Sequence, residues 1–172
     1  MTYRLVNGDS LMRKVLDDAS VGLSLLSGLP NVVKNKIGVL GHSYGGNTAL
    51  FQGATDVRIH FVCASGALCS YKQKIEVGTG LEMALVVPEV ALHFDFDKVL
   101  SAIAPRDVLI VSADEDKYSK DADRICETAK QKFTRPDGTS KLSHFRDQGG
   151  HAMTIQRHQG IIDWMRKIYE NE

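Results

Sequence analysis

The chain is 172 residues long and carries 21 basic and 21 acidic side chains, so its formal net charge is zero. This length suits a single core, and we expect one domain over 1–172. A balanced charge provides no field that would attract nucleic acid or an anionic membrane surface. With 43% hydrophobic and 24% charged residues, the composition is typical of a soluble globular protein.

The three cysteines argue against both a disulfide framework and a zinc site. Cys63, Cys69 and Cys126 are odd in number and show no CxxC spacing. The start of the sequence lacks the apolar stretch of a signal peptide, and no later run approaches the roughly 18 apolar residues of a membrane span. These features predict a cytoplasmic protein that does not enter a membrane.

The elements of the first half are marked by apolar spacing and by capping residues. Apolar side chains recur at helical spacing after Ser10, which can cap a helix as Asp9 can, and Gly28 with Pro30 ends the pattern. The predicted elements are, in order, a helix over 10–27, a strand over 37–40, a helix over 44–53 and a strand over 58–64.

The second half begins with a less regular stretch over 65–95 and then alternates again. The predicted elements are a helix over 96–103, a strand over 108–112, a helix over 122–133, a strand over 142–146 and a helix over 156–169. Helices that alternate with short apolar strands are typical of a three-layer α/β/α fold with a mostly parallel sheet.

A glycine-flanked serine lies between the first predicted strand and the helix that follows it. The residues 41–46 read G-H-S-Y-G-G, and a sharp strand-to-helix turn of this type exposes a serine hydroxyl at the sheet edge. Gly41 and Gly45 are expected where side chains would collide, and Gly46 where the helix packs closely. We therefore predict Ser43 as the nucleophile and the backbone N–H of Tyr44 as an oxyanion donor.

The acid and the base are expected later in the chain, in the order serine, acid, histidine. The strand over 108–112 leads into Asp114, Glu115 and Asp116. Asp116 is favoured, because a turn of two or three residues must project the acid towards the histidine. Asp114 is the alternative and Glu115 ranks third.

The base is predicted to be His151, which follows a Gly-Gly turn after the last strand and precedes a helix. A ring at this place can reach back over the sheet edge to Ser43. His42 is expected to pack or to hydrogen-bond beneath the elbow, and His158 to lie on a helix surface. In this scheme Ser43 attacks a carbonyl, His151 moves the proton and Asp116 fixes the imidazole.

From Ile37 to the C-terminus the chain resembles the α/β-hydrolase superfamily, in particular its dienelactone hydrolase and acetyl-xylan-esterase-like branch. The matching stretches are KIGVLGHSYGG at 36–46, APRDVLIVS at 104–112 leading to Asp116, GGH at 149–151 and DWM at 163–165. The resemblance implies the triad Ser43, Asp116 and His151 and a serine esterase that needs no metal or cofactor.

The resemblance has one departure, because the family normally has several strands before the elbow. Only 36 residues precede Ile37, and one βαβ unit takes about 30 or more. We therefore expect the C-terminal part of the fold, with about four strands and an open edge at the elbow strand. The family's second oxyanion donor, which contributes about 3 kcal/mol, would be missing from this chain.

The leading hypothesis is a carboxylesterase-type hydrolase that acts on a small-molecule ester. The alternative is a weak or inactive hydrolase fragment that acts through protein association, and a flavodoxin-like module is disfavoured because no GxGxxG is present. Residues 83–88 are expected in the core or a subunit contact rather than in a substrate pocket. An open strand edge predicts a homodimer or higher self-association.

Overall fold

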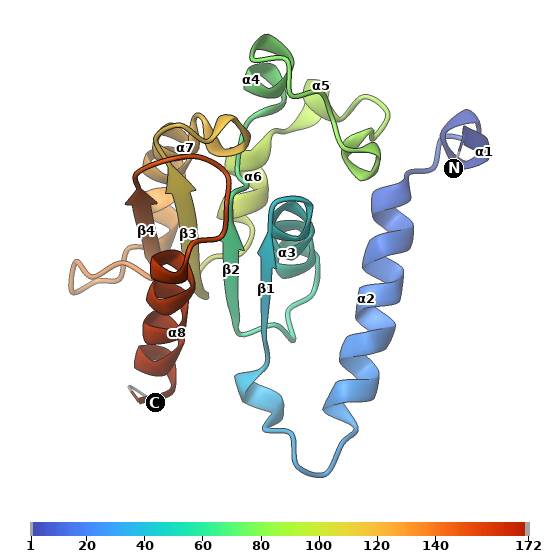
Figure 1. The fold of residues 1–172 in the computed structure, drawn as a ribbon. Coiled ribbons are helices and arrows are strands. Elements are labelled where there is room, and N and C mark those ends of the chain that lie inside the picture. The colour runs from blue at the N-terminus through green and yellow to red at the C-terminus, as the bar shows by residue number, and fades with distance from the viewer. Residues whose placement is uncertain (1, 171–172) are drawn as a thin grey trace.

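A computed structural model describes residues 2–170 and contains one four-stranded sheet (Figure 1). The strands are β1 (Gly38–His42), β2 (Phe61–Ser65), β3 (Asp107–Ala113) and β4 (Leu142–Asp147). They lie in the order β1-β2-β3-β4, and every neighbouring pair is parallel. All carboxyl ends therefore meet at one edge of the sheet, where the helices and loops that follow the strands begin.

Helices connect the strands and cover the sheet. They are α1 (Thr2–Val6), α2 (Leu11–Ser27), α3 (Tyr44–Thr55), α4 (Tyr71–Glu76), α5 (Val90–His93), α6 (Phe96–Ser101), α7 (Ala122–Phe133) and α8 (Ile155–Glu170). Short 3-10 turns lie at Lys34–Lys36, Met83–Leu85 and Lys117–Ser119. No helix within residues 2–170 is long and apolar enough to cross a membrane.

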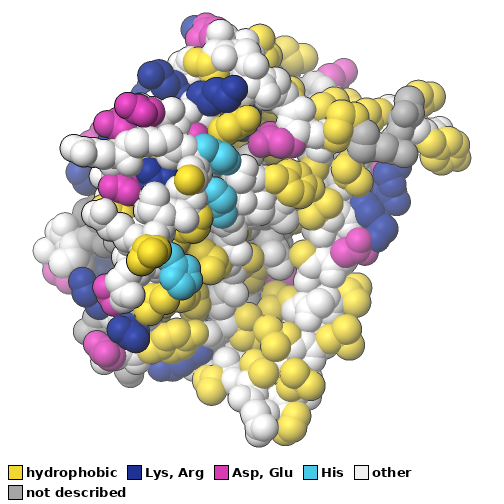
Figure 2. All heavy atoms as spheres, in the orientation of Figure 1, with side chains coloured by type: hydrophobic (Ala, Val, Ile, Leu, Met, Phe, Trp, Pro, Cys, Tyr) yellow, Lys and Arg dark blue, Asp and Glu magenta, His cyan; other side chains and the backbone are white. Residues whose placement is uncertain are grey.

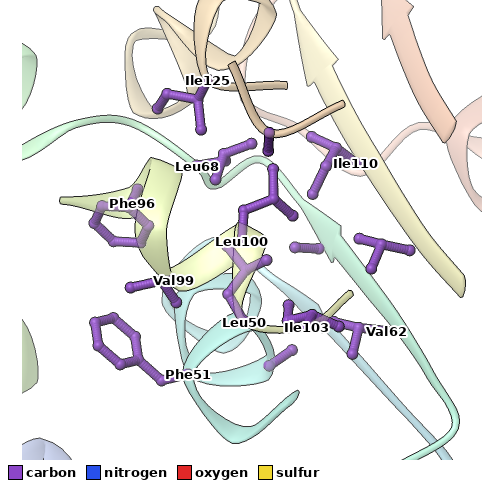
Figure 3. Close-up of a cluster of buried hydrophobic side chains, with 14 of the residues drawn as sticks. Leu50, Phe51, Val62, Leu68, Phe96, Val99, Leu100, Ile103, Ile110 and Ile125 are labelled. Carbon is purple, nitrogen blue, oxygen red and sulfur yellow. The ribbon is translucent and has the colours of Figure 1, made fainter. Parts of the chain in front are cut away.

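The two faces of the sheet are covered by different helices, which gives the predicted three layers (Figure 1). The larger apolar cluster joins one face to α2, α3, α6 and α7. Figure 3 shows its centre, where Leu50 of α3, Leu100 of α6 and Ile110 of β3 converge. A smaller cluster packs Ile161 of α8 on the other face, against Cys63 and Leu109. The fold is thus an α/β fold with a wholly parallel sheet.

The predicted strand limits need two corrections with local causes. β1 extends two residues beyond the expected end at residue 40, because His42 still pairs with Ser65 before the chain turns. β2 begins later than residue 58, since the Arg58 N–H and its guanidinium both bind Asp56 and close a turn there.

The irregular stretch over 65–95 contains short helices and contributes to the core. Within residues 83–88, expected in the core or a subunit contact, Ala84 and Leu85 are almost fully buried in the core, whereas Met83 is 47% exposed. Lys74 of α4 is also completely buried, with its Nζ 3.5 Å from Glu82 Oε2. The Asn47 Nδ2 of α3 donates to the other oxygen of Glu82 at 3.1 Å, so this segment is attached to the helix that follows the elbow.

Residues 2–36 form no strand that pairs with the outer edge of β1. Instead of one helix, they form the short α1 and the long α2, with Ser10 capping α2 through the Arg13 N–H at 3.1 Å. Figure 1 shows α1 at the end of α2 remote from the linker to β1. Within residues 2–170, β1 pairs with β2 alone, and Leu40 on this strand is 50% exposed.

Candidate active site

Ser43 lies between β1 and α3 with a positive backbone φ of 59° and a ψ of −123°. Such a conformation is costly for a residue with a Cβ and is found mainly at functional turns. Its N–H donates to the Ser65 carbonyl of β2 at 2.8 Å, which helps to hold the turn. The hydroxyl is thereby presented at the carboxyl edge of the sheet, as the sequence pattern predicts.

The glycines around Ser43 differ in how strictly the turn requires them. A Cβ on Gly41 would lie 2.0 Å from the Gly45 carbonyl oxygen, so no side chain fits there. A Cβ on Gly46 would meet the Ala67 Cβ at 2.7 Å, consistent with close packing of α3. A Cβ on Gly45 would meet nothing within 4 Å, so the predicted collision at Gly45 is wrong: it is the Gly45 backbone that Gly41 approaches.

The structure brings Ser43, His151 and Asp116 together from three separate loops. The His151 Nε2 lies 2.8 Å from the Ser43 Oγ, and its Nδ1 lies 3.0 Å from the Asp116 Oδ1. The Asp116 carboxylate accepts hydrogen bonds, which favours the tautomer with the proton on Nδ1. His151 Nε2 is then free to accept the hydroxyl proton of Ser43.

Asp116 is almost completely buried and its oxygens have further donors. Its Oδ1 accepts from the Tyr118 N–H at 2.9 Å, and its Oδ2 accepts from the Ser119 hydroxyl at 3.0 Å. These bonds belong to the 3-10 turn Lys117–Ser119, which Asp116 caps. The carboxylate is thus held in one orientation by its own loop, and the Oδ1 is aimed at the histidine.

The alternative acids have other partners. The exposed Asp114 accepts from the Gly149 N–H through Oδ1 at 2.7 Å, so it binds the backbone of the histidine loop and not the imidazole. The Glu115 N–H donates to the Gly149 carbonyl at 3.1 Å. These two bonds join the loop that carries Asp116 to the loop that carries His151.

Two aromatic rings flank the His151 imidazole, and the sequence pattern identified neither as a neighbour of the base. The Tyr118 ring centroid lies 4.4 Å from that of His151, and the His42 centroid lies 4.9 Å away. His42 also pairs its Nδ1 with the Ser65 Oγ at 3.1 Å. Burial, with a smaller effect from the neighbouring His151, lowers the pKa of His42 below its ordinary value of 6.5, which favours the uncharged form of this ring.

The remaining histidines lie away from Ser43 or have other partners. His158 is exposed on α8, and His144 pairs with Ser112 inside the sheet at 2.7 Å. The three cysteines are buried, and burial raises the pKa of each thiol to about 12. A buried thiol of such high pKa makes little thiolate, so a cysteine nucleophile has no support here.

The expected oxyanion donor, the Tyr44 N–H, belongs to the first residue of α3. The first amides of a helix have no carbonyl partner within the helix and carry its positive partial charge. A negative oxygen that develops next to the Ser43 Oγ can therefore be met by this amide. The Tyr44 side chain itself is 39% exposed beside the elbow.

Ser43 and His151 are both partly exposed, and they lie outside the apolar hollow of the molecule. A hollow of about 450 Å³ between α2 and α3 is lined by Met12, Phe51, Val87 and Phe94, among others, and by no residue of the triad. Figure 2 shows histidine side chains at the surface of the face that carries the loop before α8. The His151 side chain is about one third exposed, so the imidazole is accessible to solvent.

This architecture, with a serine elbow at the carboxyl edge of a parallel sheet, is the α/β-hydrolase fold. No family model and no curated protein matches the sequence, but solved structures match the fold. A glucuronoyl esterase from Solibacter usitatus superposes with a TM-score of 0.71 at 18% identity, over 88% of this chain and 47% of that one.

Two further esterases show the same partial coverage. The glucuronoyl esterase from Teredinibacter turnerae T7901 has a TM-score of 0.72 at 19% identity, over 93% of this chain and 47% of its own. Acetyl Xylan Esterase 1 from Thermoanaerobacterium sp. JW/SL YS485 has a TM-score of 0.60 at 20% identity, over 92% and 54%. The chain thus spans about half the length of these solved structures.

Proposed function

We propose that this chain carries the catalytic residues of a serine hydrolase of the carboxylesterase type. The observation that supports the proposal is the continuous hydrogen-bonded series from Ser43 Oγ through the His151 imidazole to Asp116, with separations of 2.8 and 3.0 Å. A hydroxyl, a base and an orienting carboxylate at these distances are the groups that acyl transfer requires. The esterase names of the superposed structures agree with this chemistry.

In the proposed reaction the Ser43 Oγ attacks the ester carbonyl carbon while its proton passes to the His151 Nε2. Asp116 stabilises the imidazolium that forms, and the Tyr44 N–H donates to the oxyanion. Collapse of the tetrahedral intermediate expels the alcohol, which takes the proton from His151 and leaves an acyl group on Ser43. Water, activated by the same imidazole, then releases the acid.

A fluorophosphonate probe tests this proposal directly, because it phosphonylates an activated serine. We expect the 172-residue chain to be labelled and to hydrolyse a p-nitrophenyl ester, and Ser43→Ala to lose both activities. His158→Ala, which removes an exposed histidine of α8, is the control and should label like the wild type. Equal labelling of Ser43→Ala would remove Ser43 from the role of nucleophile.

The second candidate is a weak or inactive hydrolase portion that acts through protein association. It is favoured by the outer edge of β1, which pairs with no other strand of residues 2–170. A second oxyanion donor contributes about 3 kcal/mol to transition-state stabilisation. Within residues 2–36 no strand precedes β1 to carry the loop expected to supply that donor. A folded chain that neither labels nor hydrolyses, but self-associates, would support this candidate against the first.

A further inference from the structure

Arg157 is a charged residue on the buried face of α8. It is 2% exposed and lies one turn before Ile161, which packs on the sheet. A guanidinium is almost never buried unless its donors are satisfied. The buried Arg157 guanidinium therefore needs hydrogen-bond partners. In the sequence, its burial is indicated only by the position of Arg157 one turn before Ile161 in the apolar stripe of α8.

The partners of the Arg157 guanidinium are Asp147, at the end of β4, and the loop that follows it and carries His151. The Nε donates to the Asp147 Oδ2 at 2.9 Å, and the Nη2 donates to the Gln148 carbonyl at 2.9 Å. The Nη1 donates to the Gly150 carbonyl at 2.7 Å and to the Ala152 carbonyl at 2.6 Å. The bond from Arg157 is also the largest cause that lowers the pKa of Asp147, so the charge of the guanidinium is balanced.

These contacts surround His151 without touching its ring. The residues directly before and after it, Gly150 and Ala152, both offer their carbonyls to one nitrogen of Arg157. From the other side, Asp114 binds the Gly149 N–H at 2.7 Å, and Gly149 has a φ of +90° that suits glycine. In Figure 1 this loop runs from β4 across the carboxyl ends of the strands to α8.

We propose that Arg157 is a positioning residue for His151, an inference that rests on the proposed function of the triad. A planar guanidinium can hold several acceptors at fixed angles, whereas an ammonium group cannot reproduce that arrangement. Arg157 fixes the peptide groups on both sides of His151, and this sets the separation of the imidazole from Ser43. The loop otherwise has two consecutive glycines, Gly149 and Gly150, which allow many backbone conformations.

The chain contains a matched control at the opposite end of the sheet. Arg106 also donates to four backbone or loop acceptors, namely the carbonyls of Gly53 (2.6 Å), Asp56 (3.0 Å), Ile59 (2.8 Å) and Ile103 (3.0 Å). It precedes β3. Three of its partners lie between the last turns of α3 and the start of β2, and Ile103 lies between α6 and β3. Arg106→Lys therefore removes a similar set of bonds away from the triad.

The first experiment compares the rate of fluorophosphonate labelling and the ester kinetics of Arg157→Lys and Arg106→Lys with the wild type. A displacement of about 1 Å in a catalytic group costs about 100-fold in rate. We expect Arg157→Lys to lose about that factor in kcat and in labelling rate, with a nearly unchanged KM. Arg106→Lys should keep both rates. Equal rates for Arg157→Lys and the wild type, or equal losses in both variants, would overturn the proposal.

The second experiment does not depend on activity. The proton on the His151 Nδ1, bonded to Asp116, gives a far-downfield NMR resonance, which should be present in the wild type, Ser43→Ala and Arg106→Lys. If this resonance is lost or broadened in folded Arg157→Lys, the positioning role is supported, whether or not the wild type is labelled. Missing labelling of the wild type would count against the proposed function and not against the positioning role. An unchanged resonance in Arg157→Lys would contradict the inference.

If circular dichroism shows that Arg157→Lys does not fold, a milder variant can be tested in its place. Asp147→Asn removes the charge that orients the Arg157 Nε but leaves the carbonyl contacts in place. We expect Asp147→Asn to lose less labelling rate, about 10-fold, and to show a shifted His151 Nδ1 resonance. If Asp147→Asn changed neither the labelling rate nor the Nδ1 resonance, the positioning role of Arg157 would be overturned.

Discussion

Asp114 and Asp116 are two residues apart and have different tasks, because successive residues of a turn point in different directions. Asp116 is buried and reaches the imidazole, whereas Asp114 is exposed and reaches the Gly149 N–H. Both side chains therefore influence His151, one through its ring and the other through its backbone. The spacing after the strand favours Asp116 as the acid, but it does not predict that Asp114 binds the backbone of the histidine loop.

The two aspartates give a sharp test at this scale. Replacing the orienting carboxylate of a serine triad by an amide costs about 10⁴-fold in kcat, so we expect a loss of that order for Asp116→Asn. Asp114→Asn keeps an oxygen that can accept from the Gly149 N–H and should lose less than about 10-fold. The measurement is ester hydrolysis by both variants. A larger loss in Asp114→Asn than in Asp116→Asn would reverse the assignment of the acid.

At the scale of elements, the segment between β2 and α6 contains an ion pair between Lys74 and Glu82, and Glu82 also accepts a hydrogen bond from Asn47 of α3. Lys74 is fully buried, its partner Glu82 is one quarter exposed, and Asn47 completes the cluster. A buried charge that loses its partner is strongly destabilising, whereas removing the charge itself is often tolerated.

This asymmetry predicts different effects for the two members of the pair. Glu82→Ala leaves the Lys74 ammonium buried without its partner and should lower the free energy of unfolding by about 3 kcal/mol. Lys74→Met fills a similar volume without a charge and should cost less than about 1.5 kcal/mol. Urea unfolding of both variants measures the difference. If Lys74→Met proves the more destabilising variant, the pair has a role other than charge compensation.

At the scale of the whole molecule, one flank is open. α8 covers β2 and β3, and it leaves Leu40 of β1 half exposed. The neighbouring α2 and its linker expose further apolar side chains, namely Val21, Leu25, Leu26, Leu29 and Val33. Figure 2 shows hydrophobic side chains gathered over this part of the molecule. An uncovered strand edge with apolar neighbours is a site for pairing with another chain.

We expect the isolated chain to associate with a second copy through this flank, most simply as a two-fold dimer. Leu40→Lys places a charge on the open strand and should shift the chain towards monomer in light scattering at micromolar concentration. Val57→Lys is the matched control, because Val57 is 83% exposed and lies in the turn after α3. A wild-type monomer, or equal shifts in both variants, would exclude the β1 flank as the interface.

The sequence by itself determined those features that depend on neighbours along the chain. Short strand-like segments marked the four parallel strands, most clearly the apolar runs at 37–40 and 108–111. The demand for a glycine at position 41 marked the elbow before Ser43, because a Cβ there would collide within the turn itself. Helix stops and caps placed α2 and α7 within a residue or two of their observed limits.

Only the tertiary structure decided the features that join distant segments. His151 lies 108 residues from Ser43 and 35 from Asp116, so the contact of its imidazole with both side chains depends on how three loops meet above the sheet. Tertiary packing also decides the open space around a Cβ at Gly45, the two rings beside His151 and the burial of Arg157. Spacing along the chain reports which face of a helix is buried, but the partners on that face are set by packing between elements.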